Sequence, residues 1–538
     1  MAESLFWADQ IAREIVERSE REKRMPNIKC QQTPSGAKHI GNLNDVIRAY
    51  FPYKALQEKK KKATFVHTTD DRDPLKDIPL RLPDLEGVWH ETKNLKDMRP
   101  YLGMPLCRIP DPFGCCKSWS EHFTKVWMDG VYSLGITPEL HSVNKLYQEG
   151  KFEPYIKIVF DKRKKVGEIV AKFQRTKDID YIPFDAICPN CGRLTNVDSF
   201  DIKSKKVGFV CGGKSIKTKR AEGCGFKGDV PWVEGKLQWR FEWPALWGIF
   251  RTTYEPFGKD HYEGSWKSGI EIAKEIYEIE PPIPFVYEFF LVNNQKMSAS
   301  VGNVYIVQDM LRIMEPEVFL YFYTKKPGKQ RNLDLANINL LVEDFENAEK
   351  TYFSDSKANT REVENIKRSY EMCMKDIPKK NPVRIPYIYA SMIYQCHGES
   401  TERIIEALKS TGHIGDGISK QDIERIKTRI RLAGNWANTF ADERYRFGLK
   451  ETISDTVRRD VSKYRKALLE FAGLIEKKAA EKDIENACWD ISNKNNMKPK
   501  EFFESIYLVL LGKKQGPRLA PFILTIGPKK VSELLKQI

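Results

Sequence analysis

Residues 31–46 read QQTPSGAKHIGNLNDV, and they join a short apolar stretch at 27–32 to a segment with helical spacing at 43–56. A turn needs one or two small residues, whereas this connection also carries His39 and Asn42. The N-terminus of a helix has unpaired N–H groups and a partial positive charge, so it attracts phosphate. His39 and Asn42 lie three residues apart, so they project to the same side of a first helical turn, and both donate hydrogen bonds to anionic oxygens. The stretch therefore predicts a phosphate site where the strand meets the helix.

A second loop with phosphate-binding character lies at 294–303, NQKMSASVGN, directly after the strand candidate IPFVYEFFLV at 283–292. Lys296 places a cation among small residues, and Ser298 and Ser300 add hydroxyl donors. These groups suit a triphosphate whose negative charge must be stabilised in a transition state. The order of the two loops along the chain suggests that one opens and the other closes the same domain.

Between about Ile28 and Val307, short apolar runs alternate with helical stretches, and the run at 63–71 ends in two carboxylates. This alternation predicts an α/β domain with a parallel sheet covered on both faces. Ligands of such sheets bind beyond the carboxyl ends of the strands. The irregular segment at about 79–233 is rich in Pro, Gly, Trp and Cys, so we interpret it as an insertion into this domain.

The last third of the chain loses its strand signals after about Asp309. Six apolar residues between Val457 and Ile475 are spaced three and four apart, which indicates one face of an α-helix whose opposite face is basic. The predicted organisation is therefore a catalytic Rossmann-type domain at 1–310 that contains the insertion, followed by an all-α domain at 311–538.

The composition favours a polyanionic partner. The 538 residues carry a formal net charge of +15, and neutralising phosphates with such an excess releases counterions. A generally basic, soluble protein is the alternative. No run is long enough for a membrane helix, and the amphipathic segment at 1–24 lacks the apolar centre of a signal peptide. We therefore expect a cytoplasmic protein with no membrane association.

Cysteines are grouped in a way that predicts metal binding in a reducing compartment rather than a disulfide framework. Two thiolate pairs, the first with Cys-x-x-Cys spacing, fit a closed tetrahedral zinc ribbon, which makes the zinc structural. A second cluster, in DPFGCCKSWSEH, contains four residue types that ligate zinc, although it also fits a turn with incidental cysteines. The first set is Cys188, Cys191, Cys211 and Cys224, and the second is Asp111, Cys115, Cys116 and His122.

Both loops resemble known motifs. HIGN at 39–42 resembles the HIGH motif of class I aminoacyl-tRNA synthetases, with Asn42 in place of the second histidine, and KMSAS at 296–300 resembles their KMSKS motif, with Ala299 in place of lysine. Longer stretches are similar to class I lysyl-tRNA synthetases of the archaeal type over essentially the whole chain. These stretches are TPSG at 33–36, DPFGCCKSWSEHF at 111–123, WRFEWPALWGIFRTTYEPFGKDHYEG at 239–264 and GPRLAPFILTIG at 516–527.

This resemblance implies ATP-dependent ligation of L-lysine to tRNA(Lys) through a lysyl-adenylate, with Mg²⁺ accompanying ATP and the helical domain binding the tRNA, most simply at its anticodon. It implies catalytic roles for four residues of the two loops and further contacts to ATP from their neighbours. The catalytic residues are His39, Asn42, Lys296 and Ser298. The neighbours are Pro34, Ser35, Gly36, Gly41, Met297 and Ser300.

A lysine pocket requires a carboxylate and an aromatic wall, because the substrate carries an ammonium group. Asp70 and Asp71 end a predicted strand, which is where such a pocket would lie. The resemblance implies that the amino-acid pocket also contains Thr33, Trp239, His261 and Tyr287. Gln31 stands where the family usually has glycine, and the family carries a metal site at the second cysteine cluster, often with histidine at position 116.

Three alternatives remain open at the level of the sequence. A small-molecule nucleotidylyltransferase would share the sheet and the first loop but would not need a zinc-bearing insertion or a basic helical domain. A non-catalytic RNA-binding paralogue would not need His39, Asn42, Lys296 and Ser298. A class I synthetase for another amino acid, such as glutamate, is disfavoured by the carboxylates at the end of the predicted strand.

Overall fold

The computed structural model describes residues 6–173, 180–216, 219–298, 301–354, 360–477 and 480–538. These residues form two compact units. The first contains residues up to 309 together with 320–333 and 360–375, and the second contains 310–319, 334–359 and the chain from 376 onward. The chain therefore alternates between the units over residues 310–375, where the sequence suggested one boundary near 310.

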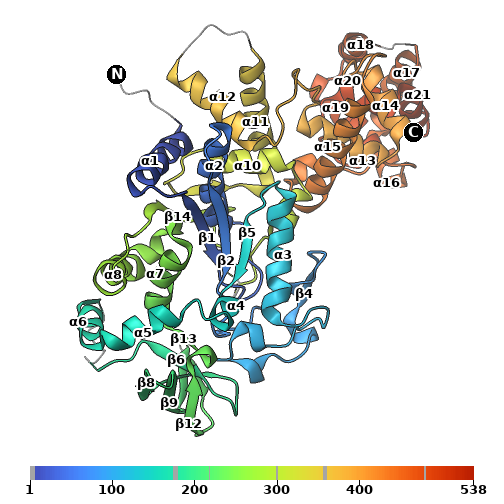
Figure 1. Ribbon diagram of the computed structural model, residues 1–538. Coiled ribbons are helices and arrows are strands. Elements are labelled where there is room, and N and C mark those ends of the chain that lie inside the picture. The colour runs from blue at the N-terminus through green and yellow to red at the C-terminus, as the bar shows by residue number, and fades with distance from the viewer. Residues whose placement is uncertain (1–5, 174–179, 217–218, 299–300, 355–359, 478–479) are drawn as a thin grey trace. The chain divides into compact units, whose positions relative to one another are not determined.

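The first unit is built on a parallel five-stranded sheet with strand order β15-β14-β1-β2-β5 (Figure 1). The central strands are almost wholly buried, although β1 and β14 carry charged residues, Lys29 and Glu255, among their apolar ones. This confirms the predicted α/β class. The strands are β1 (Asn27–Gln32), β2 (Thr64–Thr69), β5 (Glu139–Ser142), β14 (Thr252–Gly258) and β15 (Ile283–Tyr287).

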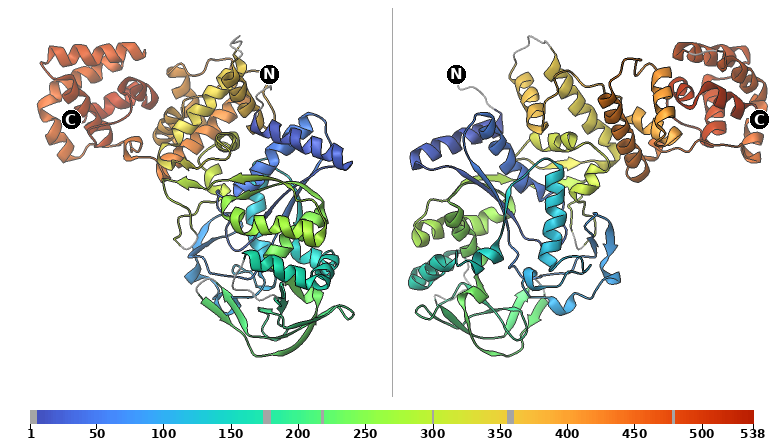
Figure 2. Two further views of the ribbon diagram at one scale, coloured as in Figure 1. Left: turned by 90° about the vertical axis from the view of Figure 1, so that its left-hand side faces the viewer. Right: turned by 45° about the vertical axis from the view of Figure 1, so that its right-hand side comes forward.

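Helices cover both faces of this sheet, and two adjacent residues of β14 show that α2 (Leu43–Glu58) and α7 (Trp239–Phe250) lie on different faces. Tyr254 donates a hydrogen bond to the backbone of Arg48 in α2, whereas Glu255 accepts hydrogen bonds from two tryptophans of α7. Successive side chains of a strand point to opposite faces, so α2 and α7 lie on different faces. In Figure 2 the blue helices α1 (Trp7–Glu22) and α2 and the green helices α7 and α8 (Lys267–Ile272) lie on different sides of the strands.

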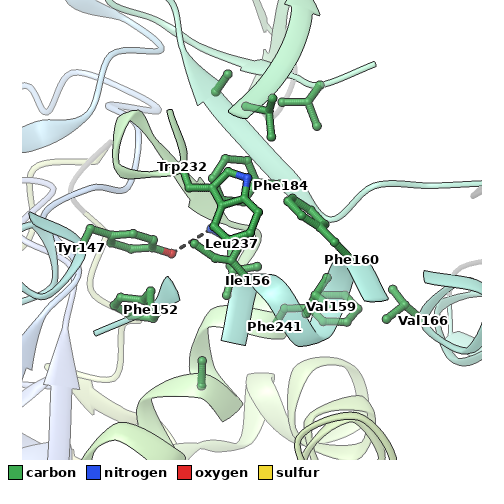
Figure 3. Close-up of a cluster of buried hydrophobic side chains, with 14 of the residues drawn as sticks. Tyr147, Phe152, Ile156, Val159, Phe160, Val166, Phe184, Trp232, Leu237 and Phe241 are labelled. Carbon is green, nitrogen blue, oxygen red and sulfur yellow. Dashed lines mark hydrogen bonds between the residues drawn. The ribbon is translucent and has the colours of Figure 1, made fainter. Parts of the chain in front are cut away.

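The prediction of one insertion at 79–233 was wrong in part, because this range contains β5 of the central sheet, which divides it into two segments. Small antiparallel sheets and helices make up both segments, and the strands after β5 share a hydrophobic core with the helices that follow β5. Figure 3 shows Tyr147, Trp232 and Leu237 in this core, with the Tyr147 hydroxyl accepting a hydrogen bond from the Leu237 amide at 2.8 Å. The strands are β3 (Arg81–Pro83), β4 (Trp89–Glu91), β6 (Phe184–Ile187), β7 (Leu194–Asn196), β8 (Ser199–Asp201), β9 (Lys206–Val210), β10 (Gly213–Ile216), β11 (Lys219–Glu222), β12 (Lys227–Pro231) and β13 (Gly235–Leu237). The helices are α3 (Trp119–Ser133), α4 (Val143–Gln148), α5 (Glu153–Asp161) and α6 (Arg163–Phe173).

Two short parallel strands and three helices after β15 belong wholly or partly to the first unit. They are β16 (Phe290–Val292), β17 (Arg331–Leu333), α9 (Val307–Leu311), α10 (Pro316–Thr324) and α12 (Arg361–Cys373).

The second unit is helical, as the loss of strand signals predicted. Its predicted basic helix begins at Ser454, whose hydroxyl caps the Val457 amide at 3.3 Å, but a short turn at Ser462–Tyr464 divides it into α16 and α17. No helix in the described part of the chain is long and apolar enough to span a membrane. The helices are α11 (Ile338–Phe353), α13 (Tyr387–His397), α14 (Thr401–Ser410), α15 (Lys420–Thr439), α16 (Asp455–Val461), α17 (Arg465–Ile475), α18 (Glu481–Lys494), α19 (Pro499–Leu511), α20 (Leu519–Ile526) and α21 (Pro528–Leu535).

Candidate active site

A cavity of about 500 Å³ lies at the carboxyl ends of β1, β2, β14 and β15, the edge at which parallel sheets bind ligands. His39 of the first loop and Lys296 of the second both line it, although 257 positions separate them in the sequence. Most of the residues expected in the site share this cavity. They are Thr33, His39, Gly41, Asn42, Asp70, Trp239, His261, Tyr287, Lys296 and Met297.

His39 is held in one orientation by the turn that contains it. The Gly41 amide donates a hydrogen bond to His39 Nδ1 at 3.1 Å, so the proton of the neutral ring lies on Nε2, which makes that nitrogen a donor. Burial and the nearby charges of Lys38 and Lys296 lower the pKa of His39 to about 4. A Cβ at position 41 would lie 2.8 Å from the imidazole, so only glycine fits this turn.

Asn42 immediately precedes α2 and makes no side-chain capping hydrogen bond. Its amide therefore remains available to a ligand at the helix N-terminus, where the partial positive charge of the helix favours an anion. His39 and Asn42 both line the cavity, as their spacing predicted.

The second loop is closed by a side chain that is not part of the predicted motif. Asn303 accepts a hydrogen bond from the Ser298 amide at 2.8 Å and donates one to the Lys296 carbonyl at 3.0 Å. The Lys296 ammonium lies 4.3 Å from the ring centroid of Phe289, and no carboxylate in the described part of the chain pairs with it. Ser298 does not line the cavity, and Ser300 lies outside the described residues.

The two carboxylates at the end of β2 have different surroundings. Asp70 lines the cavity, accepts a hydrogen bond from the Thr33 hydroxyl at 3.3 Å and has a second buried oxygen with no partner in the described part of the chain. Burial raises the pKa of Asp70 well above its usual value. Asp71 instead accepts hydrogen bonds from the Ser142 hydroxyl at 2.5 Å and the Asn144 amide at 2.7 Å, so it holds the start of α4 and does not line the cavity.

Asp45 is a cavity residue that the sequence analysis did not single out. It lies one turn into α2, three residues after Asn42, and this helical spacing was the available signal. The Tyr287 hydroxyl donates a hydrogen bond to Asp45 Oδ1 at 2.6 Å, and burial raises the pKa of Asp45 to about 7. Lys38, Asp73 and Asp260 also line the cavity and were likewise not predicted.

An aromatic wall completes the cavity and is supported from behind by a buried ion pair. Trp239 stacks on Trp243 and lies near His261, with ring centroids 5.2 and 6.3 Å away. Behind the wall, Lys29 pairs with Glu255 at 2.6 Å, and the same ammonium donates a hydrogen bond to Gln31 Oε1 at 2.6 Å. The side chain of Gln31 therefore has a fixed position where the family usually has glycine.

Three residues that the resemblance assigned to ATP do not line the cavity, namely Pro34, Ser35 and Gly36. The Pro34 carbonyl accepts a hydrogen bond from Trp119 at 3.0 Å. Gly36 has a φ of +136°, a backbone conformation that disfavours other residues. Their observed roles are thus to shape the loop that carries His39.

The four cysteines of the ribbon come together as a metal site requires. Cys188 and Cys224 lie 3.6 Å apart, as do Cys191 and Cys211. Four sulfurs about 2.3 Å from a tetrahedral Zn²⁺ would be about 3.8 Å apart, so the arrangement fits zinc. The Asn190 amide contacts the Cys224 sulfur, and hydrogen bonding lowers the pKa of this thiol to about 6, whereas burial raises the pKa values of Cys188 and Cys211.

The second cluster also brings its four residues together. Cys115 Sγ lies 3.3 Å from His122 Nδ1, and the same nitrogen lies 3.2 Å from Asp111 Oδ1. His122 Nε2 lies 3.0 Å from the Pro83 carbonyl, a contact that places the proton on Nε2 and leaves Nδ1 to ligate. Cys116 Sγ is 4.0 Å from Cys115 Sγ, so the donor set fits a second zinc.

A parallel sheet with two separated loops at one cavity is the architecture of a class I tRNA synthetase, and a family model for this class matches residues 5–376. The chain belongs to the family described as tRNA synthetases class I (K). It is 34% identical to the lysine--tRNA ligases of Natronomonas pharaonis and Haloarcula marismortui, over 99% of this chain and 97% of theirs. It is 31% identical to the lysine--tRNA ligase of Pyrococcus horikoshii over 99% of both chains. A glutamate tRNA ligase structure from Elizabethkingia meningosepticum, at 12% identity and a TM-score of 0.44, is too distant to add to this assignment.

Proposed function

We propose that this protein ligates L-lysine to tRNA(Lys) with ATP through a lysyl-adenylate. One observation carries the proposal: His39 and Lys296, from the loops that follow β1 and β16, line the same cavity as four aspartates and an aromatic wall. Full-length relatives that are named lysine--tRNA ligase support the choice of amino acid.

The reaction has two steps. The lysine carboxylate attacks the α-phosphate of ATP, a carboxyl–phosphate bond forms, and the bond to the β-phosphate breaks to release pyrophosphate. The 2′-hydroxyl of the terminal tRNA ribose then attacks the lysyl carbonyl and releases AMP. Neither step needs a nucleophilic side chain, so the protein contributes positioning and stabilisation of charge.

The phosphate end of the cavity is formed by both loops. Neutral His39 donates from Nε2 and Asn42 donates from its amide, while Lys296 supplies a positive charge as pyrophosphate leaves. Mg²⁺ would enter with ATP as part of the substrate and would offset part of the negative charge of its phosphates.

The amino-acid end offers one carboxylate for each ammonium group of lysine. Asp70, beside Thr33, lies at the end of the sheet, and Asp45, beside Tyr287, lies on α2. Both have raised pKa values, so a bound ammonium would restore their charged forms. Trp239 and His261 provide the wall along the aliphatic chain of the substrate.

The same carboxylates argue against the nearest alternative. A synthetase for glutamate would have to bind an anionic side chain beside Asp45, Asp70 and Asp260, whose carboxylates would repel it when ionised. The presence of every phosphate donor except the lysine at position 299 argues against a non-catalytic RNA-binding paralogue.

Two further parts of the proposal concern regions outside the cavity. Zinc bound by Cys188, Cys191, Cys211 and Cys224 would stabilise the insertion, with a second zinc at Asp111, Cys115, Cys116 and His122. Residues 311–538 would bind the tRNA, because the exposed side of α16 and α17 is basic. The cytoplasmic location predicted from the cysteine pattern remains part of this proposal.

The experiment that tests the function is charging of total tRNA with each amino acid in turn, in the presence of ATP and Mg²⁺. We expect lysine alone to be attached. Attachment of another amino acid would refute the proposed substrate, and no attachment of any amino acid would refute the proposed activity.

A further inference from the structure

Lys38, the residue before His39, lines the cavity but has no counter-ion there. Its ammonium reaches only the Ser35 hydroxyl, at a long 3.5 Å. Two other lysines at this edge have carboxylate partners: Lys76 pairs with Asp73 at 3.4 Å, and Lys236 pairs with Asp73 and Glu242. Among the described residues, Lys38 and Lys296 are thus the two lysines of the cavity without an ion pair.

The position of Lys38 relates it to the phosphate loops. Lys38, His39 and Lys296 all line the cavity, and the charges of both lysines lower the pKa of His39. Burial makes the unpaired charge of Lys38 costly and lowers its pKa to about 8, although Asp45, Asp70 and Asp73 partly oppose this. An anion placed against His39 would pair with Lys38 as well as with Lys296.

The sequence supplies a reason for an additional cation. The second loop has a single lysine, because alanine stands at position 299 where the KMSKS motif has its second lysine. A triphosphate would therefore find one fewer charge on that loop, whereas Lys38 provides a charge from the opposite loop.

We propose that Lys38 is an ATP-binding residue whose ammonium donates hydrogen bonds to the triphosphate, beside His39 and Lys296. This inference rests on the proposed function, since it takes ATP as the ligand of the cavity. Two other roles for Lys38 are possible outcomes of the test: binding the carboxylate of the amino acid, or only balancing the charge of Asp70 and Asp45.

The test is steady-state charging of total tRNA by the full chain, with ATP varied at saturating lysine and lysine varied at saturating ATP. Lys38→Met removes the charge and should raise the KM for ATP about tenfold or more, with the KM for lysine within about twofold of wild type. Lys38→Arg keeps a charged donor and should retain a KM for ATP within about threefold. Lys61→Met, which removes an exposed lysine outside the cavity, is the matched control.

A rise confined to the KM for lysine would assign Lys38 to the amino acid and overturn the proposal. Unchanged KM values in Lys38→Met would limit Lys38 to balancing the charge of Asp70 and Asp45. This result would overturn the proposal as well. Both results leave lysine charging by the wild-type enzyme intact, so they are distinct from failure of the proposed function.

A pH series gives a readout that does not depend on the folding of Lys38→Met. The KM for ATP of the wild type should rise above pH about 8, as Lys38 loses its proton, and Lys38→Arg should abolish that rise. The groups that face residue 38 are His39, Asp45, Asp70, Asp73, Lys76 and Lys296. These groups are the same in the wild type and in Lys38→Arg. If the KM for ATP had the same pH dependence in both proteins, the proposal would be overturned.

Discussion

Lys296 is the residue whose charge the proposed chemistry needs most directly, because it is the single lysine of its loop and has no carboxylate partner recorded among the described residues. Lys296→Ala should lower kcat about 10²-fold or more, since the lost interaction strengthens as charge develops on the phosphates. The KM for lysine should change little. Single-turnover formation of lysyl-tRNA measures this effect, and a rate equal to that of the wild type would remove Lys296 from the mechanism.

Asp45 gives the binding of lysine a pH dependence whose sign follows from its surroundings. Burial raises its pKa to about 7, and only the ionised carboxylate attracts an ammonium, so the KM for lysine should fall as the pH rises from 6 to 8. Asp45→Asn keeps a similar shape but should raise the KM for lysine and flatten this dependence. A variant that keeps the wild-type profile would show that another group controls it.

At the residue scale, the sequence identified several donor and acceptor side chains of the cavity but not the groups that they contact. His39, Asn42, Asp70 and Lys296 could be found because motif position and strand ends point to them. Asp71 has the same chemistry as Asp70, but its carboxylate holds the start of α4, and only the direction of the side chain separates the two. Such directions depend on tertiary packing, which local spacing does not contain.

At the scale of single elements, β1 and β14 are joined by a buried charge pair that no strand pattern revealed. Lys29 and Glu255 are fully buried, and Glu255 also accepts hydrogen bonds from Trp243 and Trp247. Lys29→Met would leave this carboxylate buried without its cation, at a cost of about 3–5 kcal/mol. The midpoint of thermal unfolding should fall by several degrees, whereas Lys61→Met, at an exposed pair, should leave it nearly unchanged.

Adding Glu255→Gln to Lys29→Met should recover part of this loss, because the double variant no longer buries an unpaired charge. Differential scanning calorimetry of the wild type, Lys29→Met, Glu255→Gln and the double variant measures the coupling between the two residues. If the loss of unfolding free energy in the double variant equalled the sum of the losses in Lys29→Met and Glu255→Gln, the two residues would not be coupled. The ion pair would then not be the source of the stability.

The cluster of Cys188, Cys191, Cys211 and Cys224, proposed above to bind zinc, has a prediction of its own. Purified protein should contain about two zinc ions per chain by elemental analysis, one for each ligand cluster. Cys188→Ser should lose one ion and lower the thermal stability of the first unit, because the metal would tie together loops that follow different short strands, β6 and β9 among them. A metal content unchanged by this substitution would contradict the assignment.

The elements themselves were predictable where burial is continuous. The apolar runs at β2 and β15 and the amphipathic helices were recognisable, so the α/β class followed from the sequence, whereas β5 was included in the predicted insertion. The strands of the insertion are three to five residues long and polar on one side, for example Ser199–Asp201, and so short a run has no distinctive period. The break between α16 and α17 was missed because both helices keep one apolar face in register.

At the scale of the whole molecule, the basic excess should act through tRNA. Replacing Arg459, Lys463 and Lys466 with glutamate should weaken tRNA binding at least tenfold and reduce its dependence on salt, because fewer counterions are released. Filter binding at several salt concentrations measures this, with Lys409→Glu on α14 as the control. The KM for ATP should remain that of the wild type, and equal tRNA affinity would place the tRNA on another surface.

The division into units could not be read from the sequence in full. The change from strands to helices near residue 310 is visible, but the return of 320–333 and 360–375 to the first unit is not. That return depends on long-range contacts, such as the ion pair of Arg368 with Asp9, whose partners are 359 residues apart. No local pattern records which distant helix such a residue will meet.

The pairing of Lys236 with Asp73 has a consequence for protein engineering. Lys236 comes from β13 at the end of the insertion, whereas Asp73 forms part of the cavity wall, and Glu242 of α7 shares the same ammonium. The insertion therefore cannot be exchanged independently of the residues that pair with Lys236. A chimaera that imports this segment from a distant homologue must import the matching carboxylates too, or the graft will leave a buried charge without its counterpart beside the substrate.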